Sequence, residues 1–170
     1  MPFAASGDGT GGDYFRAVPG MMRGVFIGTS DGPTFKKKDE KTGEMVDAPQ
    51  MRWHFRLKDM AGTPLFYVND EVEINGVKNV TSRLVPEGYP ESKEAVADAL
   101  SSVATGLKSK ARSWFAALLN RPIEGALSTE QVEAILAECE GKEVYLTFAY
   151  NTATPPRVAI TGVVPMPQQS

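Results

Sequence analysis

Residues 51–58 alternate strictly between large apolar and basic side chains, and this alternation constrains the fold more than any other feature of the chain. Successive side chains of a β-strand point to opposite faces of the sheet. One face of the expected strand carries the apolar set, Met51, Trp53, Phe55 and Leu57. The other face carries the basic set, Arg52, His54, Arg56 and Lys58. We therefore expect the apolar set in the core and a cationic sheet face that suits a polyanion.

Further strand signals precede and follow this segment. They are runs rich in β-branched and aromatic residues, bounded by turn residues such as Asp31-Gly32-Pro33 and Asp59-Met60-Ala61-Gly62. The expected strands are 22–29, 50–58, 64–69, 143–150 and 157–164, with 77–85 as an irregular extended segment. Glycines within 22–29 indicate a bend or a bulge in the first strand.

Helical spacing appears only in the middle of the chain. Residues 92–103 carry apolar residues at three- and four-residue steps, and residues 108–120 do so more clearly, with Trp114 and Phe115 in the apolar stripe. A third helix is expected from Ser128, because Gln131 stands in the capping-box position.

The order of these elements predicts the fold class. Three strands in a meander, a helical insertion and two final strands indicate a mainly β protein with a helical insertion (α+β). The expected architecture is a five-stranded OB-fold-like barrel with its helices between strands 3 and 4. A generic α+β sandwich has the same element order. We expect a flexible tail at 1–13, a single OB-like domain at 14–164 and a short tail at 165–170.

Composition argues against several classes of function. The chain has 170 residues, one cysteine (Cys139) and one histidine (His54), so neither an intrachain disulfide nor a multi-histidine metal site is possible. It contains no phosphate-binding loop, dinucleotide fingerprint or nucleophile elbow. We therefore expect no catalytic residues, metal or cofactor, and a protein that is not an enzyme. No apolar run is long enough to span a bilayer, and no secretory signal is present, so we expect a cytoplasmic protein.

Basic residues are concentrated despite a net charge of -3. They outnumber acids over 16–58 and again over 107–122, whereas 124–143 is strongly acidic. The candidate phosphate contacts in the first half of the chain are Arg23, Lys36, Lys37, Lys38, Arg52, His54, Arg56 and Lys58. Tyr67 and Tyr145 are the expected stacking platforms for bases, chosen from a set that also includes Phe26 and Phe66. The competing interpretation is that the basic row only solvates a half-exposed sheet.

The segment 106–122, Gly-Leu-Lys-Ser-Lys-Ala-Arg-Ser-Trp-Phe-Ala-Ala-Leu-Leu-Asn-Arg-Pro, resembles a helix found in small bacteriophage-encoded proteins. Those proteins also have an upstream Trp-x-Phe strand, here Trp53-His54-Phe55, and a closing Gly-Lys-strand segment, here after Glu140. The resemblance covers residues 15–165 and implies an OB-like fold related to phage single-stranded-DNA-binding proteins. The chain differs in having Asn120 where glycine is common, and its segment 165–170 carries no acidic residues with which to recruit partners.

Three basic residues at the start of the expected helix, Lys108, Lys110 and Arg112, are further candidates for nucleic-acid binding. Free N–H groups at a helix N-terminus favour phosphate, although the helix dipole disfavours cations there. An equally weighted alternative is that the polar side of this helix is simply basic.

These observations lead to a ranked set of hypotheses. The first is low-specificity binding of single-stranded DNA in phage replication or recombination, inside the bacterial host cytoplasm. The alternative is a protein-interaction module that binds or inhibits a host protein, with the acidic stretch 124–143 as its surface. A structural virion component is the third. Partners would be single-stranded nucleic acid and host or phage replication proteins, but no membrane, and self-association is compatible with the sequence.

Overall fold

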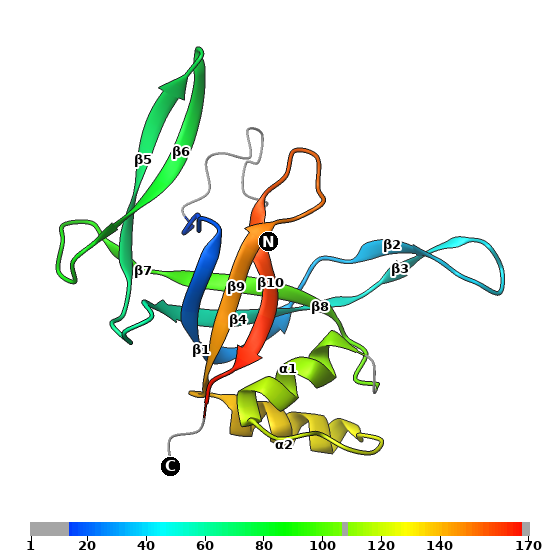
Figure 1. The fold of residues 1–170 in the computed structure, drawn as a ribbon. Helices are drawn as coiled ribbons and strands as arrows, with labels where there is room; N and C mark the ends of the chain where they lie inside the picture. The colour runs from blue at the N-terminus through cyan, green and yellow to red at the C-terminus, as the bar shows by residue number, and fades with distance from the viewer. Residues whose placement is uncertain (1–13, 107–108, 168–170) are drawn as a thin grey trace.

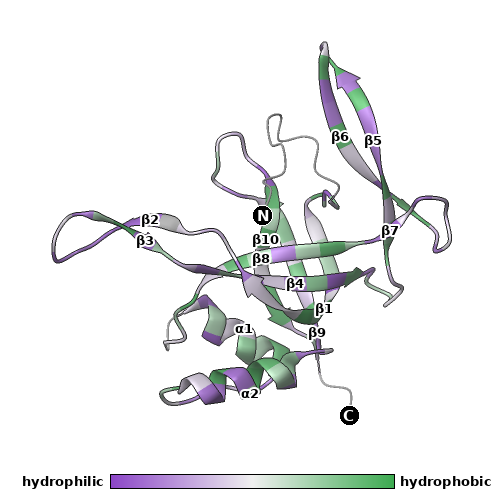
Figure 2. Ribbon diagram, turned by 180° about the vertical axis from the view of Figure 1, so that it is seen from behind, coloured by the Kyte–Doolittle hydropathy of each residue, from purple (hydrophilic) through white to green (hydrophobic). Residues whose placement is uncertain are grey.

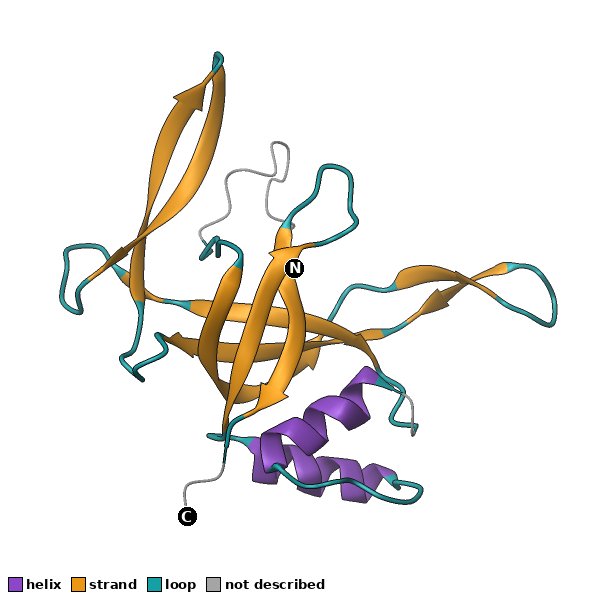
Figure 3. Cartoon of the chain, viewed as in Figure 1, coloured by secondary structure: helices purple, strands orange, loops and turns teal. Residues whose placement is uncertain are grey.

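The computed structural model of the chain describes residues 14–106 and 109–167, and it is mainly β with antiparallel sheets (Figures 1 and 3). The fold class expected from the sequence is confirmed at this level. The central sheet has five strands in the order β10-β9-β1-β4-β8. Its strands are β1 (Gly20–Asp31), β4 (Gln50–Lys58), β8 (Val96–Ser102), β9 (Glu143–Tyr150) and β10 (Val158–Pro165). The two helices, α1 (Lys110–Leu119) and α2 (Thr129–Cys139), come between β8 and β9 in the chain.

Two hairpins project from the body in different directions (Figure 1). The first, called here the β2–β3 arm, consists of β2 (Phe35–Lys38) and β3 (Met45–Ala48). The second, the β5–β6 arm, consists of β5 (Phe66–Ile74) and β6 (Val77–Val85), with the short β7 (Lys93–Glu94) paired at its base. The arms carry long hydrophilic stretches, whereas the central strands are more hydrophobic (Figure 2).

The core lies between the central sheet and α1. Trp53, Phe55 and Leu57 are fully buried, as the alternation of residues 51–58 predicts, and Met51 is half-buried. The indole ring of Trp53 meets Trp114 of α1 edge-on, with 5.1 Å between the ring centroids. Burial of side chains of this size stabilises the fold by roughly 1.5–3 kcal/mol each, so this contact fixes the helix against the sheet.

Strand β1 bends so that it can pair with β4 on one side and β9 on the other. Its register with β4 shifts between Phe26 and Gly28, and Gly28 has a φ of +133°. This backbone conformation favours glycine, and a bulge of this kind increases the local twist. The expected bend in the first strand is therefore present and lies at Gly28.

The prediction of a helix at 92–103 is wrong, because this segment forms β7 and β8. On β8 and just before it, the inward-facing residues are small, and Ala95, Ala99 and Ser101 are buried. Small inward residues hide the two-residue period from a hydrophobicity pattern. Segment 64–69, expected as the third strand of the central sheet, instead begins the β5–β6 arm, and β8 takes its place.

The central sheet is open rather than a closed barrel. Its edge strands are β8 and β10, and no hydrogen-bonded ladder joins them in the described part of the chain, although they approach each other. Within residues 14–106 and 109–167, neither helix is long and apolar enough to cross a bilayer. The expected tail at 1–13 and the last residues of the expected tail at 165–170 lie outside the described residues.

Candidate nucleic-acid interface

The basic row of β4 lies on the outer face of the central sheet, as the alternation of residues 51–58 predicts. On that face Lys58 is the cross-strand neighbour of Arg23 on β1, and Arg52 is the neighbour of Leu100 on β8. Arg56 is exposed, and the other three members are half-buried. The structure therefore brings Arg23 and the β4 row together on one surface.

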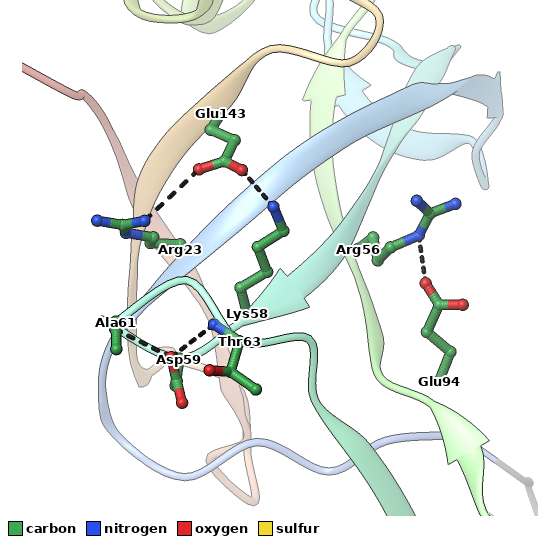
Figure 4. A network of polar contacts seen from close by, with 8 residues as sticks. All are labelled: Arg23, Arg56, Lys58, Asp59, Ala61, Thr63, Glu94 and Glu143. Carbon is green, nitrogen blue, oxygen red and sulfur yellow. Dashed lines mark hydrogen bonds and ion pairs between the residues drawn. The ribbon is translucent and has the colours of Figure 1, made fainter. Parts of the chain in front are cut away.

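One carboxylate neutralises much of the charge at the Lys58 end of the row. The Glu143 carboxylate on β9 lies 2.5 Å from Lys58 Nζ and 4.0 Å from an Arg23 nitrogen (Figure 4). Each of the three side chains is only about a quarter exposed. The Arg23 Nε is buried, and no hydrogen-bond partner for it lies in the described residues. Because Glu143 already binds both cations, a phosphate would have to compete with it here.

Arg56 is also paired. Its Nε lies against the Glu94 carboxylate of β7 (Figure 4), in an ion pair whose two side chains are nearly half exposed. Solvent-exposed pairs of this kind contribute little to stability and are easily exchanged for another anion. Arg56 is thus accessible to a phosphate, at the expense of Glu94.

His54 is held at both ring nitrogens by the flanking strands. Its Nδ1 lies 2.6 Å from an Asp98 carboxylate oxygen on β8, and its Nε2 lies 2.7 Å from the Ser30 hydroxyl on β1. The order serine–histidine–aspartate also occurs in hydrolytic triads. Here Ser30 and Asp98 are exposed on the sheet face. The contacts of the three groups cross-link β1, β4 and β8.

Arg52 differs from the rest of the row. In the part of the chain that the structure describes, no carboxylate lies within ion-pair distance of its guanidinium. It is half-buried beside the exposed side chain of Leu100. Arg52 is therefore the member of the row that can take up an anion without losing an existing partner.

The β2–β3 arm leaves the central sheet at the Arg52 end, because β1 and β4 last pair at Asp31 and Met51. On this arm Lys36 forms an exposed ion pair with Asp47 at 2.5 Å. Lys37 and Lys38 are exposed, and neither has an ion-pair partner among the described residues. The lysines thus lie beyond the Arg52 end of the sheet face, on a projecting hairpin.

The two tyrosines expected to stack on bases differ in their surroundings. Tyr145 on β9 is half-buried and is the cross-strand neighbour of Arg23, so it shares the outer face with the basic row. The expectation that Tyr67 is available for stacking is corrected, because this residue is only 5% exposed and packs against Phe15, with ring centroids 5.3 Å apart. Phe26, considered for the same role, is fully buried in the core.

The expectation that Arg112 contacts nucleic acid is also corrected, because this residue is buried and its side chain binds backbone carbonyls of the protein. Its guanidinium donates to the Thr105 carbonyl over 3.1 Å and 2.8 Å, and to the Ile123 carbonyl over 3.0 Å. These hydrogen bonds join the segments that enter and leave α1. Lys110 is exposed in the first turn of α1, and Lys108 lies outside the described residues.

Sequence reasoning missed a concave surface of the described chain. A cleft of about 740 Å³ opens between the edge strands β8 and β10. Its walls include Tyr14, Arg16, Val96, Asp98, Arg157 and Ile160. Tyr14, Arg16 and Arg157 come from segments outside the strands and helices, so no periodic pattern could have indicated that they meet.

The outer face can bind an anionic chain at Arg52 and offers an aromatic ring at Tyr145, while most of its other cations are already paired. A scan of protein-family models and a search of curated proteins both found no match to this chain.

Proposed function

We propose that the protein binds single-stranded DNA with low sequence specificity, as replication or recombination in a phage-infected cell requires. The strand connectivity supports this most. The five strands of the central sheet, taken in chain order, are β1, β4, β8, β9 and β10, and the first pairs with both the second and the fourth. An OB-fold is a partly open, five-stranded Greek-key barrel that binds oligonucleotides on its strands 2 and 3.

In an OB-like frame, the face of strands 2 and 3 is the outer face of β4 and β8. That face carries Arg52, and the β2–β3 arm with Lys37 and Lys38 occupies the connection between strands 1 and 2. The helices lie between strands 3 and 4, as in the OB-fold. In the described residues the seam between β8 and β10 is open.

Because several cations are already paired with carboxylates, only the unpaired ones set the expected salt dependence of binding. On the described outer face and the β2–β3 arm, about three cations, Arg52, Lys37 and Lys38, are free to release counterions, and this surface alone predicts a slope of about -2 for log affinity against log salt on a single strand. Affinity should therefore fall about 20-fold between about 50 mM and 200 mM salt. A protein with every basic residue of the face unpaired would show a steeper dependence.

Titration of labelled oligo-dT at these two salt concentrations, followed by fluorescence anisotropy, tests the proposal. Arg52→Glu should weaken binding strongly, because it replaces the free cation of the face with an acid. The matched control is Arg121→Glu, an exposed arginine paired with Glu138 beside the helices. If the unaltered protein does not bind oligo-dT at low salt, the proposal is wrong.

A second candidate function, protein interaction, is favoured by a separate observation. The tips of the arms expose apolar side chains, Ile74 and Val77 on the β5–β6 arm and Met45 and Val46 on the β2–β3 arm. Exposed apolar groups at a projecting tip suit a protein partner better than a nucleic acid. Recovery of one host protein by pull-down after nuclease treatment, lost when Ile74 and Val77 are replaced by serine, would support it.

A further inference from the structure

The cleft between β8 and β10 is large enough to hold a ligand. Its volume of about 740 Å³ falls within the range of small-molecule sites. The edge strands provide Val96, Asp98 and Ile160, and the remaining walls come from the N-terminal segment, β6 and the connection between β9 and β10. The cleft therefore combines apolar lining residues with polar groups from four separate segments.

Tyr14 provides an aromatic side chain in the lining of the cleft. It is 49% exposed, and the Arg16 guanidinium carbon lies 4.1 Å from the centre of its ring. The β5–β6 arm anchors this segment, because Asn69 donates to the Tyr14 carbonyl over 3.1 Å and the Arg16 backbone N–H donates to Ser82 over 2.7 Å. These bonds fix the backbone on either side of the ring, and the Arg16 guanidinium lies over the ring itself, so stacking on a planar ligand orders little further chain.

Arg157 provides a positive charge on another wall. It ends the connection between β9 and β10, where Asn151 accepts hydrogen bonds from the backbone N–H groups of Arg157 and Ala153 at 3.0 Å and 3.1 Å. Arg157 is exposed, and no carboxylate lies within ion-pair distance of it in the described part of the chain. The Asp98 carboxylate in the same cleft is engaged by His54 at 2.6 Å.

From this arrangement we infer that the cleft binds one nucleotide of a single-stranded nucleic acid. The base stacks on Tyr14, and a neighbouring phosphate lies at Arg157. An extended peptide added to the free edge of β10 would gain backbone hydrogen bonds, but it would need neither the aromatic ring nor the arginine. The inference rests on the proposed function and adds a contact outside the β4 face.

Two sets of variants test this inference by anisotropy with labelled oligo-dT. Tyr14→Ala should weaken binding about tenfold, since stacking on an aromatic ring contributes about 1–3 kcal/mol per base. Tyr14→Phe should bind as the unaltered protein does, and Arg157→Gln should weaken binding and flatten the salt dependence. The matched control is Tyr89→Ala, because Tyr89 also lies beneath an arginine, Arg83, but is not part of the cleft.

Photo-crosslinking locates the contact independently. Oligo-dT carrying 5-iodouracil should crosslink to Tyr14, as read by mass spectrometry of the digested protein. If the unaltered protein binds oligo-dT while Tyr14→Ala and Arg157→Gln bind equally well and no crosslink forms at Tyr14, this inference fails and the proposed function stands. If the unaltered protein does not bind oligo-dT, both fail.

Discussion

Replacement of Arg112 by methionine should destabilise the fold without directly affecting a nucleic-acid contact. The side chain is 6% exposed and donates three hydrogen bonds to two backbone carbonyls, those of Thr105 and Ile123. Methionine preserves most of the apolar stem but provides no donor. Each hydrogen bond from a charged group contributes about 1.5–3 kcal/mol. Two carbonyls lose their partner, and partial hydration of these loop carbonyls lowers the cost, so we expect a loss of about 3 kcal/mol.

Thermal unfolding followed by circular dichroism measures this loss. For a chain of this size, a loss of about 3 kcal/mol lowers Tm by roughly 6–12 °C. Arg112→Lys should lie between the two proteins, because it keeps the charge but not the planar fork. The control is Arg121→Met, which removes an exposed arginine near the end of the same helix. A variant with unchanged Tm and weakened oligo-dT binding would refute the structural role and restore Arg112 as a nucleic-acid contact.

Two further predictions concern single side chains. Burial raises the pKa of the Cys139 thiol to about 12. Mass spectrometry after treatment with iodoacetamide at pH 8 should therefore show no modification of the folded protein and alkylation of the protein unfolded in urea. Rapid alkylation of the folded protein would contradict this. Because the pKa is higher in the folded state than in the unfolded state, this thiol's contribution to stability should be lost as pH rises from about 9 towards 12. Glu143→Gln should strengthen oligo-dT binding and steepen the salt slope by about 1.4, since it releases two cations, Lys58 and Arg23. Unchanged binding would show that this end of the sheet face lies outside the binding site.

The parts of the fold that were predictable from sequence are those with a strong local period. The strand at 50–58 and the aromatic stripe of α1 combine large apolar residues with a regular spacing, and Trp53 and Trp114 are core residues as expected. Strand β8 was missed because its inward residues are alanine and serine. Their small volume lets them face the core while contributing little to a hydrophobicity pattern.

The charge balance of the candidate site could not be predicted from local sequence. Glu143 meets Lys58 from a strand 85 residues further along the chain, and Glu94 reaches Arg56 from the short β7. A local run of basic residues gives no information about carboxylates that the fold brings to it. Arg112 was misassigned for the same reason, because its backbone partners lie on loops at either end of the helix.

The two arms tolerate substitutions that the buried core of the protein does not. Among the side chains that the structure describes, Tyr67 at the base of the β5–β6 arm is the one arm residue in the buried core. Substitutions nearer the tips of either hairpin therefore alter surface chemistry at little expense in stability. A lineage of such chains could exchange partners by varying these tips while the sheet and its helices stayed the same.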